Sequence, residues 1–339
     1  MSVLLIDGDN LLTIGFYGLK NHFYKGKHIG AIFHFLNTIR RAIEEYHLDK
    51  VVVFWDGEDC QMTRKKIYHQ YKENRRKRLR TEEEISSYNY QRTRVKQYLE
   101  ELYVRQGEFH YCETDDSIAF YTQKATNEDI IIYSSDGDLV QLISDKVKLY
   151  NPSLKRIVNN GELIVYDKEE ILVDNLKIAK IICGDKSDNI YGIRGLGIKK
   201  MISFFPEIKT KKLSLSEVIE KSNNIFEQDK NNKTIANLLT GVTKEGVLGD
   251  EFFIVNETIV SLDKPFLTED AKTDILSLIN EELDPDGRSY KNTMKMMIED
   301  GIFNVLPKSD DTWVKFLNPF LRLTRKEKNK RKIKIKNHD

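Results

Sequence analysis

The sequence predicts an α/β protein with a central, mainly parallel sheet flanked by helices, followed by a largely helical second part. Three observations predict this fold. Residues 3–6, 51–55 and 130–133 are short, branched, apolar runs, and each is followed closely by an aspartate. Residues 29–46 carry apolar side chains at helical spacing. From residue 167 to about residue 306 the pattern is largely helical.

The apolar runs VLLI (3–6), VVVFW (51–55) and IIIY (130–133) are interpreted as strands. Short continuous apolar strands are typical of a parallel sheet that is buried on both faces. The amphipathic segment 29–46 is expected to be a crossover helix between the first two strands. Further helices are expected over 89–105 and from about Asp116 onward. This first domain covers residues 1–166.

The second domain is expected over residues 167–306. Asp167 followed three residues later by Glu170 is a capping-box pattern, which predicts a helix over 168–182. Residues 221–250 are polar and give no clear pattern. A basic tail covers 307–339, and Pro319 argues against one continuous helix through WVKFLNPFLRL (313–323). This apolar segment is expected to pack on the body, with docking to another protein as the alternative.

Composition limits the classes of protein that fit. The chain has 339 residues, 40% hydrophobic and 32% charged, which indicates a charged globular protein. No apolar run approaches the roughly 20 residues needed to span a bilayer, and no signal-peptide pattern is present. The three isolated cysteines form no CxxC pair, so we expect reduced thiols and a cytoplasmic location. The seven scattered histidines argue against a zinc site.

The net charge of +1 conceals two basic segments. Residues 61–80 and residues 322–336 each carry nine Lys/Arg against one Glu, so each has a local charge of +8. Subtracting 16 from +1 leaves −15 for the remainder of the chain. An acidic body with two basic segments indicates binding of a polyanion at defined places, with solvated charge runs as the plainer interpretation.

Acidic residues gather at expected strand ends and in adjoining loops. The strand ends of an open α/β sheet converge on one crevice, where carboxylates crowded together without cations would repel each other. Oxygen ligands without His or Cys favour Mg²⁺ or Mn²⁺, and two such ions can hydrolyse a phosphodiester. The candidate ligands are Asp7, Asp56, Glu113, Asp115, Asp116, Asp136, Asp138, Asp185 and Asp188.

Two alternatives to a metal-dependent nuclease remain open. Asp7-Gly8-Asp9 directly after the first strand also fits a phosphatase of the haloacid dehalogenase type, which forms an aspartyl-phosphate. That interpretation leaves Asp56 and the basic segment unexplained. The other alternative is a non-catalytic protein that binds branched DNA, and the full set of carboxylates argues against it.

In order, these segments resemble the 5′ nuclease or flap endonuclease superfamily, which combines a PIN-like nuclease domain with a helix-three-turn-helix. The segments are LLIDGDN, VVVFWDG, YHQYKENRRK, ETDDSIA, IIIYSSDGDLVQL and CGDKSDNIYGIRGLG. The resemblance covers nearly the whole chain, and the ribonuclease H branch of T-even bacteriophages is the most similar one. It implies that the nine acids named above hold the metals. Asp9 departs from the small polar residue usual in the family and is expected to act behind the ligands or in the turn.

The resemblance also implies residues that contact nucleic acid. Residues 61–100 are similar to a helical arch, in which Lys72 would lie over the scissile phosphate, assisted by Arg75. Tyr71 would stack on a terminal base, and Arg64 would contact the phosphate from the base of the arch, whereas Arg76 is as well explained by a solvated surface. Residues 168–205 would form the helix-three-turn-helix. Its hairpin would bind duplex phosphate, and a K⁺ ion, through Gly192, Gly195, Gly197, Lys199 and Lys200.

The sequence therefore predicts a Mg²⁺-dependent 5′→3′ exonuclease and flap endonuclease. By resemblance, its substrates would include branched or 5′-flap DNA and RNA–DNA hybrid, with RNA-primer removal (ribonuclease H activity) in DNA replication as the process. A single-stranded-DNA-binding protein and a sliding clamp are the partners that the resemblance implies. We expect a monomer, located in the host cytoplasm if the chain is of phage origin.

Overall fold

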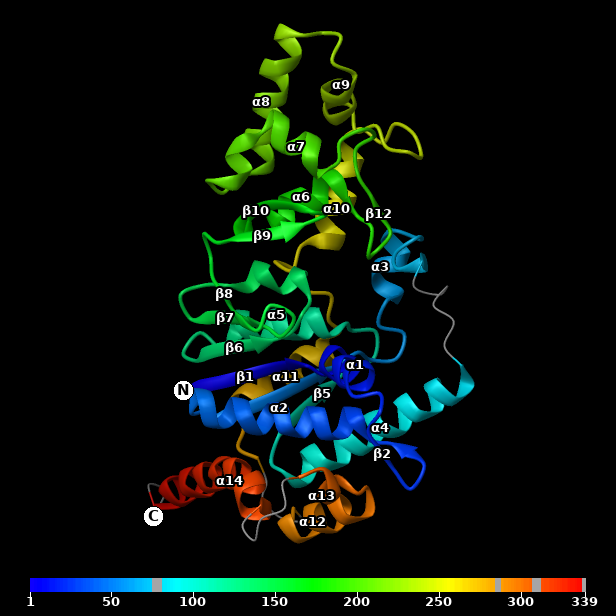
Figure 1. Cartoon of the computed structure of the whole chain (residues 1–339). Coiled ribbons are helices and arrows are strands. Elements are labelled where there is room, and N and C mark those ends of the chain that lie inside the picture. Colours follow the sequence, from blue (N-terminus) through cyan, green and yellow to red (C-terminus); the bar gives the residue numbers. More distant parts are fainter. Residues whose placement is uncertain (75–80, 284–287, 307–311, 337–339) are drawn as a thin grey trace.

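The computed structural model describes residues 1–74, 81–283, 288–306 and 312–336, with side chains described as far as Arg325. The predicted arch residues Arg75 and Arg76 lie outside the described residues. Within the described part, no helix is long and apolar enough to cross a membrane. The molecule is elongated: the sheet lies in the middle, one helical part lies above it and another below it (Figure 1).

The central sheet has six strands in the order β5-β4-β1-β6-β7-β8, and β8 alone runs antiparallel to its neighbour. The prediction of a mainly parallel sheet is therefore confirmed. A short hairpin, β2 (Phe23–Tyr24) and β3 (Lys27–His28), follows the first helix. The sheet strands are β1 (Ser2–Asp7), β4 (Lys50–Trp55), β5 (Arg105–Glu108), β6 (Asp129–Tyr133), β7 (Val147–Asn151) and β8 (Arg156–Val158).

Helices cover both faces of the sheet, so the central strands β1 and β4 are mainly apolar and buried. One face packs on α1 (Gly8–Gly18), α2 (Gly30–Tyr46) and α4 (Glu82–Glu101) through Leu4, Ile6 and Trp55. The other face packs on α5 (Thr114–Lys124), with α11 (Glu269–Asn280) alongside, through Leu5 and Phe54. Successive side chains of a strand point to opposite faces, which is why neighbouring residues belong to different cores.

The described part of the predicted arch, residues 61–100, contains α3 (Met62–Ile67) and most of α4. The sequence predicted a helix over 89–105, but α4 starts at Glu82 because Thr81 and Glu84 form a reciprocal capping box. Similarly, α5 starts at Thr114, two residues before the predicted start.

The predicted helix over 168–182 is wrong at its start. Residues 163–172 form an antiparallel hairpin, β9 (Leu163–Tyr166) and β10 (Glu169–Leu172). Asp167 and Lys168 have φ angles of 43° and 73°, so they make its turn instead of a helix cap. A 3-10 turn (Val173–Asn175) leads into α6 (Leu176–Cys183). The predicted domain boundary at 166/167 falls at the turn between β9 and β10. The division of the chain into two domains stays a prediction.

The helical part above the sheet follows α6. A two-stranded ladder, β11 (Gly184–Asp185) and β12 (Ile190–Tyr191), leads to α7 (Ile198–Phe204) and a 3-10 turn (Pro206–Lys209). The unassigned segment 221–250 contains the end of α8 (Leu215–Gln228) and all of α9 (Lys233–Leu239). Helix α10 (Asp250–Val260) packs back on α6.

The lower part consists of α12 (Tyr290–Glu299), α13 (Ile302–Val305) and α14 (Thr312–Lys336). The prediction that Pro319 interrupts the last helix is wrong, because α14 continues through it. The lost backbone hydrogen bond is offset by burial: Phe316, Leu317 and Phe320 pack in the core beside α2. The prediction that this segment packs on the body is therefore confirmed.

Candidate active site

The carboxylates that follow β1 and β4 lie side by side because these strands are parallel neighbours. The Asp7 side chain caps α1 by accepting from the Asn10 N–H (3.0 Å), and its other oxygen accepts from the Ser134 hydroxyl (3.1 Å). The Asp56 carboxylate accepts from the Thr114 N–H at 2.9 Å, at the start of α5. The ends of β1, β4 and β6 and the start of α5 thus lie at one edge of the sheet.

The next acids come from the first turn of α5 and from the loop after β6. Glu113 is the N-cap position of α5, and Asp115 and Asp116 lie in its first turn. Asp136 accepts a hydrogen bond from the Asp138 N–H (2.9 Å), which opens a 3-10 helix. Asp115 interacts electrostatically with both Asp7 and Asp136, so these segments form one cluster.

The last two acids belong to the ladder that follows α6. Carboxylate oxygens of Asp138, Asp185 and Asp188 all lie within 4.8 Å of one another. This spacing is short enough for the three side chains to share one cation. The two distant sequence motifs SSDGD and GDKSDN are thereby brought together.

Crowding and burial change the protonation of these acids. Burial, then the nearby carboxylates led by Asp56, raises the pKa of Asp7 to about 8. Burial and the charges of Asp136 and Asp7 raise the pKa of Asp115 well above its usual value. The Asp56 side chain is in contact with water. Its pKa is nevertheless raised, first by desolvation from the surrounding protein and then by the carboxylates of Asp9 and Glu113. A cluster in this state favours binding of either protons or cations.

Lys180 lies among the acids and was missed by the sequence analysis. Its ammonium lies 2.5 Å from Asp138 Oδ1 and 2.6 Å from Asp185 Oδ2, with the side chain buried. Burial acts to raise the pKa of Asp185, but Lys180 outweighs it and the pKa is lowered. The signal was present in the sequence: Lys180 follows Leu176 by four residues on α6, at a spacing that puts both on one helix face.

Arg64 does not take the position that the resemblance implied. Its guanidinium is buried and forks onto Asp116, with Nη1–Oδ2 and Nη2–Oδ1 distances of 2.5 and 3.0 Å. It also donates to Glu113 (2.6 Å) and to the Ile259 carbonyl (3.2 Å). A contact from Arg64 to a phosphate does not fit this arrangement. Both carboxylate oxygens of Asp116, which is fully buried, accept hydrogen bonds from Arg64. A role of Asp116 as a direct metal ligand therefore stays a prediction.

Tyr71 and Lys72 also point inward. The Tyr71 hydroxyl donates to Glu113 at 3.0 Å and its ring is buried, which does not fit the predicted stacking on a terminal base. The Lys72 ammonium lies 2.5 Å from Glu113, and its backbone, in the left-handed region (φ 53°), donates to the Asp188 carbonyl. Lys72 is therefore beside the acidic cluster, and its action on a phosphate stays a prediction.

Asp9 lies behind the cluster, as expected. It accepts two hydrogen bonds from Arg92 of α4, with Nε–Oδ1 and Nη2–Oδ2 distances of 2.8 and 3.1 Å. Asp9 also accepts from the Asp56 backbone N–H at 2.9 Å. Arg92 was missed by the sequence analysis, and Asp9 was the signal, because an additional acid at a crowded site calls for a cation.

The three predicted hairpin glycines lie between β12 and α7, whereas Lys199 and Lys200 lie in the first turn of α7. Gly192 is required for packing, because a Cβ there would lie 2.0 Å from the Cys183 carbonyl carbon. Gly195 has φ +80°, and Gly197 is the N-cap position of α7 with open space around it. Lys199 and Lys200 are exposed, and Lys200 donates to the Thr234 hydroxyl at 2.7 Å.

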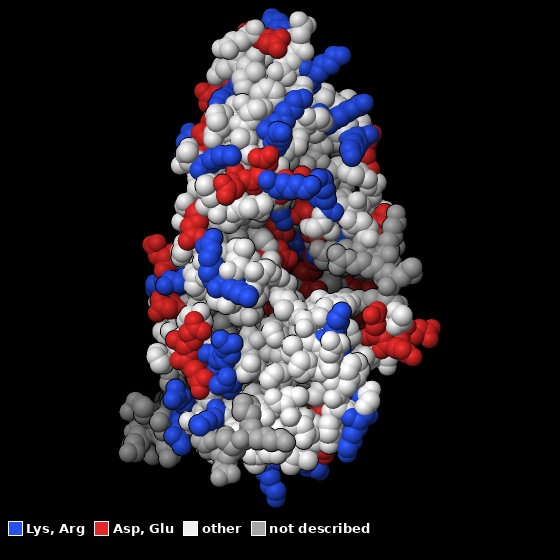
Figure 2. All heavy atoms as spheres, viewed as in Figure 1, with Lys and Arg blue, Asp and Glu red and all other residues white. Residues whose placement is uncertain are grey.

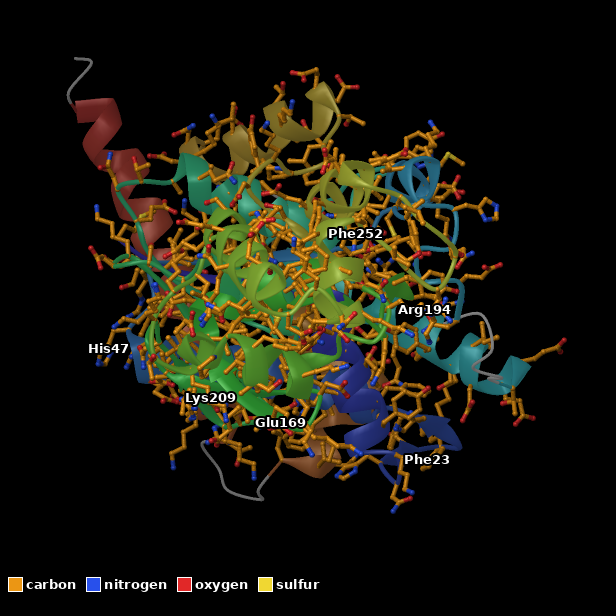
Figure 3. The ribbon with its side chains drawn as sticks, turned by 90° about the horizontal axis from the view of Figure 1, so that it is seen from above. Phe23, His47, Glu169, Arg194, Lys209 and Phe252 are labelled. Atoms are coloured by element: carbon orange, nitrogen blue, oxygen red, sulfur yellow. The ribbon has the colours of Figure 1, made fainter. Side chains whose placement is uncertain are left out.

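The hairpin faces the same side of the molecule as the arch. Seen from above, Arg194 of the hairpin lies on that side, whereas Lys209 lies on the opposite side (Figure 3). The hairpin backbone is fixed by the Arg194 N–H, which donates to the Val242 carbonyl. The exposed arginine is a hairpin residue that the sequence analysis did not single out.

A cleft of about 800 Å³ opens beside the cluster and is lined in part by Asp136, Lys180 and Asp185. Figure 2 shows a hollow with acidic atoms at its floor and basic side chains above it. The donor set fits a divalent cation: the three convergent groups are carboxylates, and neighbouring carboxylates have raised pKa values. Hard oxygen ligands of this kind suit Mg²⁺ or Mn²⁺.

Comparison with known families gives a match over half the chain. Residues 2–174 match the N-terminal, resolvase-like domain of 5′-3′ exonucleases. The 5′-3′ exonuclease of Halalkalibacterium halodurans is 30% identical over 227 residues, 61% of this chain and 70% of that protein. The 5′-3′ exonuclease of Mycoplasmopsis pulmonis is 28% identical over 285 residues, 83% of this chain and 87% of that protein.

A solved structure has a similar fold. The flap endonuclease of bacteriophage T5, solved as a pseudo-enzyme-product complex with DNA and metal ions, aligns with a TM-score of 0.59 at 18% identity. The alignment covers 96% of this chain and all of that one. These comparisons confirm the predicted superfamily and fold, and the narrower likeness to the T-even branch stays a prediction. The phosphatase and the non-catalytic alternatives find no support.

Proposed function

Because this chain belongs to the 5′-3′ exonuclease family and is a phosphodiester hydrolase, we propose that it is a Mg²⁺-dependent 5′→3′ exonuclease and flap endonuclease. It acts at the junction of a 5′ single strand and a duplex. The observation that supports this proposal is the carboxylate cluster beside Lys72, at the floor of an open cleft.

The carboxylates have a defined part in this proposal. Asp138, Asp185 and Asp188 would hold one cation. Asp7, Asp115 and Asp136, whose charges interact, would serve a second. Bound Mg²⁺ supplies an activated water and stabilises the charge that develops on the phosphate and the leaving oxygen. Asp56 and Glu113 complete the cluster around these groups.

Two lysines balance the charge of the cluster. Lys180 offsets the charges of Asp138 and Asp185, and Lys72 offsets that of Glu113. Lys72 would stabilise the negative charge that develops on a phosphate bound beside the cluster. The same proposal gives Arg75, which lies outside the described residues, the role of assisting Lys72.

The helical part binds the duplex. Gly195 and Gly197 let the backbone approach a phosphate, and Lys199 adds positive charge. The exposed Arg194 adds a further positive charge to this hairpin. A K⁺ ion bound by the hairpin carbonyls is part of the same proposal.

The proposed substrates include 5′-flap DNA and RNA primers annealed to DNA, and the proposed process is DNA replication. We also propose that the enzyme is a monomer and that it acts in the cytoplasm. A single-stranded-DNA-binding protein and a sliding clamp are proposed partners. The apolar side chains Phe316, Leu317 and Phe320 are buried in the body, so they are not the surface that such a partner contacts.

A cleavage assay tests the proposal. A 5′-labelled flap duplex with an RNA or a DNA arm is incubated with Mg²⁺, with EDTA, and with an Asp136→Asn/Asp138→Asn variant. Release of short 5′ products that needs Mg²⁺ and is lost in the variant supports the proposal. Tight binding without cleavage indicates a binding protein. Hydrolysis of p-nitrophenyl phosphate with intact DNA indicates a phosphatase.

A further inference from the structure

The backbone N–H and C=O of Asp56 are both hydrogen-bonded by the ion pair between Asp9 and Arg92. The proposed reaction does not use this pair. Asp9 Oδ2 accepts from the Asp56 N–H at 2.9 Å, and Arg92 Nη2 donates to the Asp56 carbonyl at 3.0 Å. Arg92 and Asp9 are joined by two further hydrogen bonds of 2.8 and 3.1 Å. The pair thus closes a ring of hydrogen bonds around the backbone of Asp56.

The pair is itself fixed from behind. Arg92 Nη1 donates to Glu108 of β5 at 2.9 Å, and its guanidinium lies 5.1 Å from the centre of the Trp55 ring. A guanidinium over an indole face is favourable, and the stacked plane limits its rotation. Arg92 belongs to α4, so the returning leg of the arch is tied to the backbone of a candidate metal ligand.

This arrangement fixes the direction of the Asp56 carboxylate. Its backbone is held on both sides, and Oδ1 accepts from the Thr114 N–H. The hydrogen bonds come from α1, α4 and α5, which all abut the sheet. Ligands that are held by such an outer layer lose less conformational entropy when they bind a cation.

We infer that Asp9 and Arg92 are positioning residues that orient Asp56 for a divalent cation. The inference rests on the metal-dependent function proposed above. It assigns the pair no contact with the substrate. Loss of residues that orient metal ligands commonly weakens metal binding by about 10- to 100-fold.

The test measures binding of Mn²⁺ to the metal-free full-length protein by calorimetry, without nucleic acid. The variant Asp9→Ala/Arg92→Ala removes one charge of each sign, so the net charge of the site region is unchanged. The matched control is Arg94→Ala/Glu299→Ala, which removes the 2.9 Å ion pair between Arg94 of α4 and Glu299 of α12. It also removes the contact of Arg94 with Asp300, which keeps its hydrogen bonds from Tyr90 and Tyr98. Thermal unfolding of both variants checks that they are folded.

The Asp9/Arg92 variant is expected to bind Mn²⁺ about tenfold more weakly, while the control stays within about twofold of wild type. Equal affinity of the Asp9/Arg92 variant and wild type would overturn the inference. No binding to wild type would instead overturn the proposed metal centre. If the double variant does not fold, Arg92→Lys replaces it, because lysine keeps the charge but lacks the fork; unchanged affinity there refutes the inference as well.

Discussion

Replacing Arg64 by methionine tests the buried network that joins the base of the arch to the carboxylate cluster. Methionine fills much of the same volume, but Asp116, which has no exposed surface, then keeps the hydrogen bond from the Phe266 N–H without the Arg64 guanidinium. Glu113 keeps Lys72 and Tyr71. Removing one member of a buried ion pair costs about 3–5 kcal/mol, and the retained partners of Glu113 set the expectation at about 3 kcal/mol.

The assay is equilibrium unfolding in urea, followed by circular dichroism. The double variant Arg64→Met/Asp116→Leu removes both charges and is expected to recover most of the lost stability, because a well-packed apolar pair replaces the ion pair. The reasoning is refuted if Arg64→Met unfolds at the wild-type urea concentration. A fall of about one in the salt slope of flap-DNA binding would then identify Arg64 as a phosphate contact.

Three further predictions concern Lys72, Lys199 and the buried carboxylates Asp7 and Asp138. Lys72→Ala is expected to lower the single-turnover cleavage rate about 100-fold, because a positioned cation is lost. Its affinity for flap DNA, measured by anisotropy, is expected to stay within about threefold of wild type. Equal losses in rate and affinity would contradict this. Lys199→Ala is expected to reduce the salt slope of duplex binding by about one without changing the cleavage rate at saturation. In metal-free protein, the pKa values of Asp7 and Asp138, raised by burial to about 8 and about 7, mean that the folded state holds protons that the unfolded state releases. Stability should therefore fall as pH rises from about 4 to about 8, and Mg²⁺ should raise the melting temperature more at pH 8 than at pH 5.5; a melting temperature that rises with pH in EDTA contradicts this.

The sheet and the position of the carboxylates followed from local patterns. Apolar runs that are closely followed by Asp7, Asp56 and Asp136 are enough to identify parallel strands and their common edge. The hairpin at Asp167 was not predictable in the same way. Its capping-box pattern is real, but the antiparallel pairing of residues 163–166 with the neighbouring residues 169–172 outweighs it.

The cations of the site were the hardest part to predict. Arg64 and Lys72 lie in a basic segment that predicts a surface for binding nucleic acid, yet both form buried ion pairs with Glu113. Their partner is about 40–50 residues away in the sequence, so no local pattern indicates the contact. Lys180 and Arg92 were missed for a different reason: charged helix residues are usually exposed, so the signals at Leu176 and Asp9 were not used.

The most direct test of the central claim is the single-turnover cleavage rate of a 5′-flap duplex, with and without Mg²⁺, for wild type and Asp115→Asn. Asparagine keeps the shape of Asp115 and removes one charge from the cluster. The account predicts cleavage that depends on Mg²⁺ and a loss of roughly 1,000-fold in the variant, about 4 kcal/mol of transition-state stabilisation. Cleavage by wild type in EDTA, or a variant within tenfold of wild type, would contradict it.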